Sequence, residues 1–219
     1  MKVDSRSFKK KCVVVAAALG AVLTASSVLI GTDAANEDQR RAPGGEVRRV
    51  SGDRIKLKDG RDIEFAAIRL PFEHEPYADK ARHTLEKWVN DEGVRLAFDD
   101  EWGINDDRLL AYVYANDTFI NERLVRAGLA FVKLRAGNRK YEAVLLKAQA
   151  EAREERNGMW TLLKATSGVP FVGDEERATF HRPECAKRPG ESKAEIQLKG
   201  SAEALERGMA PCGKCRPMD

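Results

Sequence analysis

The chain has 219 residues, of which 42% are hydrophobic and 33% are charged, values that are ordinary for a soluble globular protein of one or two domains plus a leader. Its net charge is +3, but residues 1–31 hold five basic residues and one acidic residue, so residues 32–219 hold 33 basic and 34 acidic residues and a net charge of −1. The main part of the chain is therefore not a basic protein, which weakens the expectation of nucleic-acid binding without excluding a local basic patch.

The N-terminal segment has the pattern of an export leader. Lys2, Arg6 and the Lys9–Lys11 cluster precede an uncharged run from Cys12 to Gly31, which is long enough to span a bilayer as a helix. Residues 1–31 therefore predict a signal peptide or an uncleaved signal anchor, and 32–45 a flexible linker. Either reading places the rest of the chain outside the cytoplasm, whether secreted, periplasmic or held at the membrane by the N-terminal helix.

The next stretch predicts three β-strands. Glu46 to Leu57 reads as the first strand, and Arg61 to Leu70 contains the next two. Apolar and polar residues alternate on both sides of Lys58–Arg61, which includes the Asp-Gly pair typical of a tight hairpin turn.

Helical and strand periods then alternate along the chain. Apolar residues at helical spacing predict helices over residues 76–90, 121–127 and 141–157. Short apolar runs predict a fourth strand over 94–98 and a fifth over 109–115.

Several segments carry a family resemblance. Gly52-Asp53, the run Arg108-Leu-Leu-Ala-Tyr-Val-Tyr, the run Ile120-Asn-Glu-Arg-Leu-Val-Arg-Ala-Gly-Leu-Ala and Gly158-Met-Trp are similar to motifs of the staphylococcal nuclease (thermonuclease) family. The resemblance covers residues 46–163. It implies an α+β, mainly β fold: a five-stranded OB-fold barrel with three helices.

The resemblance also implies where the nuclease site lies. Asp53 keeps the first metal carboxylate, and Arg108 stands where the family has its second phosphate-binding arginine. Glu64 occupies the position of the first such arginine. The second metal aspartate is replaced by Arg69, and the general-base glutamate by Phe72.

These replacements reverse charges where a calcium ion and a phosphate would bind. At separations of about 4–6 Å and an effective dielectric near 20, each reversal opposes binding by roughly 3–4 kcal/mol. Arg69 and Glu64 are expected to pair with one another across the cleft. Glu73, one position past the expected base, is the candidate to replace it if the loop shifts.

The C-terminal part predicts a small metal-binding module over residues 171–219, after a linker at 164–170. His181 and Cys185 precede a Cys212-Gly-Lys-Cys215 turn, which together can supply four ligands to a structural zinc ion. The segment resembles Ada-type metal-binding domains, which use four cysteines, and is expected to form a zinc-ribbon-like α/β module with a short helix over Ser201–Gly208. A disulfide between two of the three cysteines is the alternative outside the cytoplasm.

Two functions remain open from the sequence. The first is an exported interaction protein with little or no nuclease activity, which binds single-stranded DNA or RNA, or a protein of the cell envelope, through the old cleft and the zinc module. The second is a calcium-dependent extracytoplasmic endonuclease with a rearranged site in which Arg108 and Glu73 are catalytic and Asp53 binds the metal. A purely structural role in the envelope is the third alternative.

Overall fold

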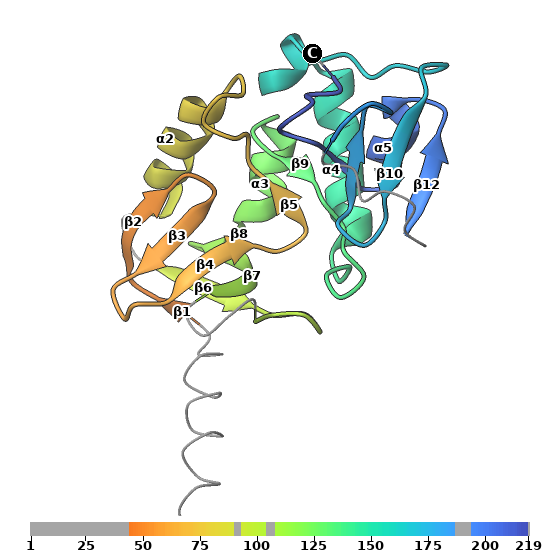
Figure 1. Cartoon of the computed structure of the whole chain (residues 1–219). Coiled ribbons are helices and arrows are strands. Elements are labelled where there is room, and N and C mark those ends of the chain that lie inside the picture. The colour runs from red at the N-terminus through yellow and green to blue at the C-terminus, as the bar shows by residue number, and fades with distance from the viewer. Residues whose placement is uncertain (1–43, 90–92, 104–107, 187–193, 219) are drawn as a thin grey trace, which may run out of the picture. The chain divides into compact units, whose positions relative to one another are not determined.

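The computed structural model describes residues 44–89, 93–103, 108–186 and 194–218. The predicted leader, and all but the last two residues of the predicted linker, lie outside these ranges. Within them, no helix has the length and apolar character needed to cross a membrane. The described residues all belong to one compact unit, Asp38–Asp219 (Figure 1).

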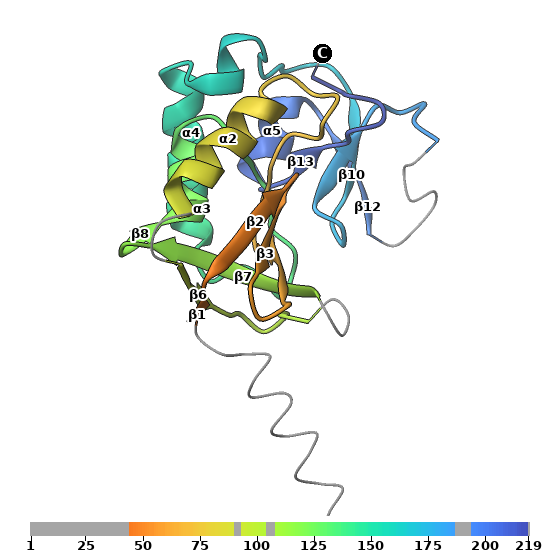
Figure 2. The same ribbon diagram turned by 90° about the vertical axis from the view of Figure 1, so that its left-hand side faces the viewer.

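A mixed sheet makes up most of the N-terminal half. Its strands follow the order β1-β6-β7-β4-β3-β2, with β8 added beside β7, and β4 is parallel to β7 (Figure 2). The strands are β1 (Gly44–Gly45), β2 (Val47–Ser51), β3 (Arg54–Leu57), β4 (Asp62–Phe65), β6 (Val94–Ala97), β7 (Arg108–Ala115) and β8 (Thr118–Phe119). This strand order has two ends and does not by itself establish the closed barrel that was expected.

The predicted hairpin is confirmed. Ile55 of β3 lies opposite Ile63 of β4, so both side chains point into the core, where each is fully buried. Gly60 takes a φ of +100° in the connecting turn, a conformation that favours glycine. The predicted first strand is in fact two: Gly52, with φ +59°, turns the chain between β2 and β3, which pair antiparallel.

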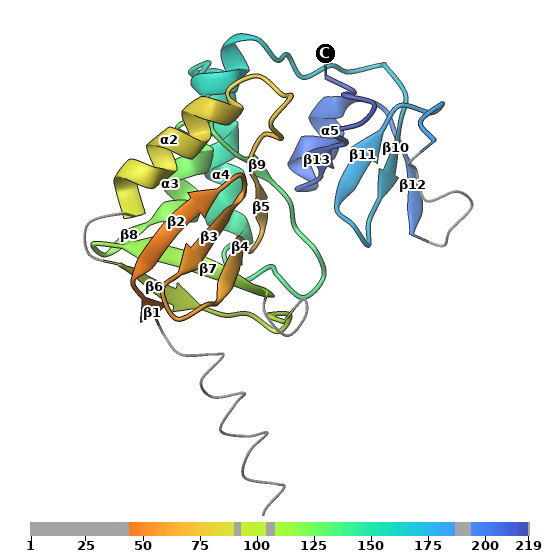
Figure 3. The ribbon, with the colours of Figure 1, turned by 60° about the vertical axis from the view of Figure 1, so that its left-hand side comes forward.

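Three helices pack together against this sheet. They are α2 (Ala78–Val89), α3 (Ile120–Arg126) and α4 (Glu142–Glu154), followed by a short 3-10 turn, η1 (Gly158–Thr161). The helix α3 contacts β7 and lies between α2 and α4 (Figure 3). All three were predicted from apolar spacing, and the observed ends differ by only one to three residues.

The strand β5 (Ile68–Arg69) leaves the main sheet and pairs with β9 (Phe131–Val132). Ala67 has a φ of +60°, unusual for a residue with a side chain, and this turns the chain away from the line of β4. This turn sets the direction of the Arg69 side chain, and Arg69 is one of the charged residues that line the cleft described below.

The C-terminal part is a four-stranded sheet of order β12-β10-β11-β13, with the helix α5 (Ser201–Glu206) beside it. Its strands are β10 (Phe171–Asp174), β11 (Thr179–His181), β12 (Glu195–Leu198) and β13 (Ala210–Pro211). Phe180, Leu205 and Met209 of this part share one buried cluster with Phe131 and Trp160 of the N-terminal part. The whole is an α+β fold in which the two parts are packed through a common core.

Candidate functional site: a remodelled cleft and a Cys/His group

A cavity of about 190 Å³ lies where the resemblance puts the nuclease site. We call it the cleft cavity; its charged and amide lining consists of Asp53, Glu64, Arg69, Lys133, Arg135 and Asn138. Asp53 stands in the turn between β2 and β3, and its carboxylate lies 3.6 Å from Nε of Arg54. The predicted first metal carboxylate therefore does face the cleft.

Arg69 is held in place by the fold. Its side chain is only 6% exposed, and its Nη1 donates to Oε2 of Glu75 at 2.6 Å. Nη2 donates to the carbonyl of Pro211 at 3.1 Å, and the guanidinium lies 4.5 Å and 4.7 Å from the ring centroids of Phe72 and Phe131. The expected pairing of Arg69 with Glu64 is wrong, because the turn at Ala67 points Arg69 towards the C-terminal part.

Glu64 instead lies between two other arginines. Its two carboxylate oxygens are each 4.0 Å from a guanidinium nitrogen, one of Arg108 and one of Arg135. Arg108 stands at the start of β7, as predicted, and faces a carboxylate that would repel a phosphate. The cations at this end of the cleft are thus partly neutralised within the protein.

A general base for phosphodiester hydrolysis would have to come from the loop after β5. Phe72 is 39% exposed and lines the cleft cavity. Glu73 is exposed and is absent from the described lining of the cleft cavity. Glu75 points inward, but its carboxylate is taken by Arg69 and by the backbone N–H of Phe72, which donates to it at 2.8 Å.

The described lining of the cleft cavity offers few oxygen ligands for calcium. This ion takes about six to eight oxygen ligands. Within the described part of the chain, the only group of three or more potential metal-ligand side chains is the Cys/His group of the C-terminal part. The cleft cavity is lined by two carboxylates, of which Glu64 is close to two arginines, and by the buried Arg69, which the resemblance aligns with the second metal aspartate.

Three further cleft residues, Lys133, Arg135 and Asn138, were missed from the sequence. Burial, and then the charge of Arg135, lowers the pKa of Lys133 to about 8. The side chain of Asn138 is buried, and neither of its polar atoms has a hydrogen-bond partner among the described residues. The alternation of Lys133 and Arg135 with buried Val132 and Leu134 was the signal that could have placed both cations on the cleft side.

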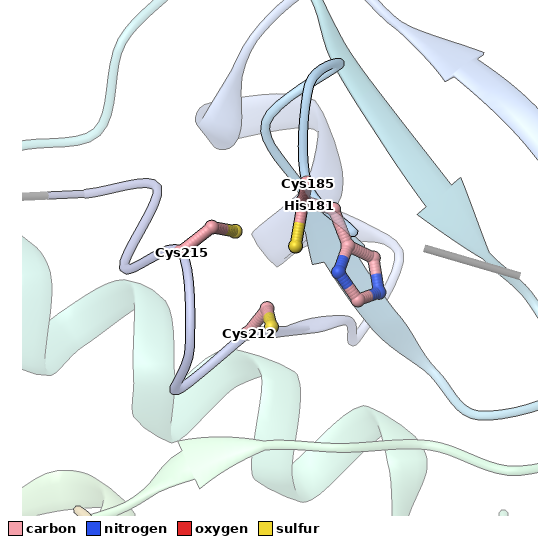
Figure 4. A group of neighbouring side chains, drawn as sticks. All are labelled: His181, Cys185, Cys212 and Cys215. Carbon is pink, nitrogen blue, oxygen red and sulfur yellow. The ribbon is translucent and has the colours of Figure 1, made fainter. Parts of the chain in front are cut away.

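The predicted metal ligands of the C-terminal part do come together. The ligand atoms of His181, Cys185, Cys212 and Cys215 all lie within 4.8 Å of one another (Figure 4). A tetrahedral metal with bonds of about 2.3 Å places sulfur ligands about 3.8 Å apart, so small side-chain rotations would complete the set. This is a group that could bind a metal ion.

The environment of the group suits a bound metal ion. None of the three described cysteines forms a disulfide, and both ring nitrogens of His181 are buried without a hydrogen-bond partner. Burial lowers the pKa of His181 and raises that of the Cys215 thiol to about 12. A bound cation would relieve both problems, because it deprotonates a coordinating thiol and accepts a lone pair of the neutral imidazole.

The turn that carries two of these cysteines is bonded to the cleft. His74 donates from Nε2 to the carbonyl of Gly213 at 2.8 Å, while Arg69 holds the carbonyl of Pro211. The backbone N–H of Leu134, next to Lys133, donates to the carbonyl of Gly208 at 2.8 Å. Hydrogen bonds thus connect the cleft to the C-terminal part that carries the Cys/His group.

Comparison with known proteins agrees with this architecture over the N-terminal part. The model of the family described as "Staphylococcal nuclease homologue" matches residues 48–162. The chain is 31% identical over 122 residues to the thermonuclease of Staphylococcus intermedius and 27% identical over 124 residues to that of Staphylococcus hyicus, in each case covering 52% of this chain and 73% of the relative. It is 30% identical over 129 residues to the SPbeta prophage-derived endonuclease YokF of Bacillus subtilis (strain 168), which covers 52% of this chain and 42% of that protein. The chain belongs to the staphylococcal nuclease homologue family.

Proposed function

We propose that this protein binds nucleic acid through the cleft without calcium-dependent hydrolysis. The observation that carries the proposal is the Arg69–Glu75 pair, in which the residue at the second metal position is a buried cation bonded at 2.6 Å to its own carboxylate. Removing a partner from such a pair leaves an uncompensated buried charge, so the pair resists the rearrangement that a calcium site would need.

The lining of the cleft cavity supports binding of a nucleotide. Lys133 and Arg135 offer positive charge to a phosphate. The buried amide of Asn138 lines the same cavity and lacks a partner among the described groups. An asparagine amide can donate and accept at once, which matches the edge of an unpaired base.

The rival function is a calcium-dependent endonuclease; the names of the relatives indicate nuclease activity for those proteins. It requires Glu73 to move from the exposed loop into the cleft and Arg108 to leave Glu64. Glu75 cannot serve as the base while its carboxylate is bonded to Arg69.

The two functions are separated by one paired experiment. A fluorescently labelled single strand is added to the purified chain, and anisotropy and strand length are followed in calcium-free buffer and with excess Ca²⁺. Binding of equal strength in both buffers, with an intact strand, is the expected result. Binding that needs Ca²⁺, or a shortened strand only when Ca²⁺ is present, would reject the proposal in favour of the endonuclease.

We further propose that the Cys/His group holds one structural zinc ion. His181 and the three cysteines suit this ion, which prefers sulfur and nitrogen ligands in tetrahedral sites. Metal analysis of the reduced chain should find about one equivalent of zinc, given the tight binding of structural sites. Less than about half an equivalent would count against zinc and leave the disulfide alternative.

The proposed location is outside the cytoplasm, supported by the leader-like pattern of residues 1–31. The proposed architecture of the sheet is the OB-type barrel of this family, supported by the family match over residues 48–162. Fractionation of cells that express the full chain, with and without residues 1–31, tests the location. Recovery of both forms in the cytosol would contradict it.

A further inference from the structure

A second cavity, of about 780 Å³, adjoins the cleft cavity. We call it the junction groove. Arg69, Phe72 and Lys133 line both cavities, and the C-terminal part adds Lys214 and Arg216 to the groove. The groove therefore runs from the old nuclease site to the turn that carries Cys212 and Cys215.

The described charged side chains that line the junction groove are all basic, whereas those of the cleft cavity have both signs. Two carboxylates line the cleft cavity, whereas no acidic side chain is found in the described lining of the junction groove. Lys214 and Arg216 are exposed there, and Lys133 lies at the point where the two cavities meet. Lysine and arginine along one groove, with no carboxylate between them, attract a polyanion.

An aromatic platform lies along the same groove. The rings of Phe72 and His74 are nearly parallel and stacked with an offset, with an interplanar angle of 6° and centroids 6.0 Å apart. The hydrogen bond from His74 to Gly213 fixes this platform on the metal-binding turn. Aromatic faces beside a basic groove are the usual means of binding single-stranded nucleic acid, since unpaired bases stack while cations hold the backbone.

We propose that the junction groove binds the sugar–phosphate backbone of single-stranded nucleic acid, with Lys214 and Arg216 of the C-terminal part as added phosphate contacts and Phe72–His74 as the stacking platform. This inference rests on the proposed function, which it extends beyond the cleft cavity. The carboxylate of Glu64 repels a phosphate from the position where the family binds it. The strand therefore runs away from Glu64 and over the metal-binding turn.

The test compares strands of two lengths. A labelled dinucleotide reaches only the cleft cavity, whereas a strand of about 12 nucleotides also fills the junction groove. The full chain is compared with the double variant Lys214→Glu/Arg216→Glu, and the matched control is Lys87→Glu/Lys199→Glu, which removes two exposed lysines that line neither cavity. DNA and RNA of each length are measured separately, because the shared phosphate backbone is the proposed determinant.

The double variant Lys214→Glu/Arg216→Glu should lose affinity for the long strand only. At about 0.1 M salt, losing two contacts that each release about 0.7 counterion lowers the affinity for the long strand about 25-fold, and lowers the salt slope by about 1.4. Affinity for the dinucleotide is unchanged, and the control variant binds both lengths as the unaltered chain does. Polyglutamate competes only weakly, since it cannot stack on Phe72 and His74.

Three outcomes overturn the inference. If the unaltered chain binds the dinucleotide and the longer strand with equal affinity, the proposed function is supported but binding in the junction groove is refuted. If polyglutamate competes as well as DNA, the groove binds an acidic peptide. If the unaltered chain binds neither length, the proposed function fails as well. The variant Lys133→Gln serves as a second probe in case the double variant loses its metal. Lys133 lies outside the metal-binding turn and lines both cavities, so this substitution should weaken binding of both strand lengths.

Discussion

The ion pair between Arg69 and Glu75 yields a strong prediction about stability. The two side chains are 6% and 10% exposed, so solvent screens them little. Arg69→Met keeps an unbranched chain between Phe72 and Phe131 but leaves the carboxylate of Glu75 unpaired. Breaking a buried pair in this way costs about 3–5 kcal/mol. For a folded unit of this size the loss corresponds to a fall in Tm of about 6–20 °C.

The assay is urea unfolding of a double-mutant cycle: Arg69→Met, Glu75→Gln and both together. The double variant should be more stable than the sum of the single losses predicts, with a coupling energy of about 1–3 kcal/mol. Arg82→Met is the control, because Arg82 and Glu86 form a half-exposed i,i+4 pair at 3.0 Å that contributes about 0.5 kcal/mol or less. A loss below about 1 kcal/mol for Arg69→Met, or no coupling with Glu75, would refute the view that Arg69 belongs to the fold.

Four further predictions concern the two sites. Lys133, with its pKa lowered to about 8, should bind a phosphate best when protonated, so affinity should fall about fivefold in total, the contribution of one phosphate contact, as the pH rises through 8, and Lys133→Arg should remove this dependence. The same shift means that the unfolded chain binds more protons between pH 8 and about 10, so free energies of unfolding from urea titrations should rise over that range. Cys212→Ser should lose the bound metal in elemental analysis and lower Tm in calorimetry. Gly213→Ala should weaken long-strand binding in anisotropy titrations by about 1–3 kcal/mol, because a Cβ there would lie 2.2 Å from the Phe72 ring and displace it.

Much of the fold follows from local sequence. The β3–β4 hairpin follows from alternation around an Asp-Gly turn, and α2, α3 and α4 from apolar spacing. The split of the first strand at Gly52 was missed because Asp53 and Arg54 continue the same polar pattern through the turn. The Cys/His group was predictable because metal ligands have characteristic spacings that do not depend on the rest of the fold.

The contacts of the cleft could not be predicted in the same way. Arg69 was expected to pair with Glu64 across the cleft, but the positive φ of Ala67 directs it to Glu75 and Pro211. The junction groove joins Lys133 to Lys214, residues far apart in the chain, through packing that no local pattern encodes. The partners of Arg69 and the lining of the junction groove therefore became visible only in the structure.

The C-terminal part and the cleft are mechanically linked. Metal binding at Cys212 and Cys215 would fix the turn whose carbonyls, at Pro211 and Gly213, accept hydrogen bonds from Arg69 and His74. Arg69 thus joins the cleft to the C-terminal part through its bonds to Glu75 and to the carbonyl of Pro211.

The most direct test of the central claim is a single-turnover cleavage measurement. The full chain, in excess over an end-labelled single strand, is incubated with and without Ca²⁺, and the products are resolved by length. We predict that the strand is bound and that the rate of cleavage with Ca²⁺ equals the rate without it. Cleavage that appears only with Ca²⁺ and is abolished by Arg108→Ala would contradict the account and identify an active nuclease.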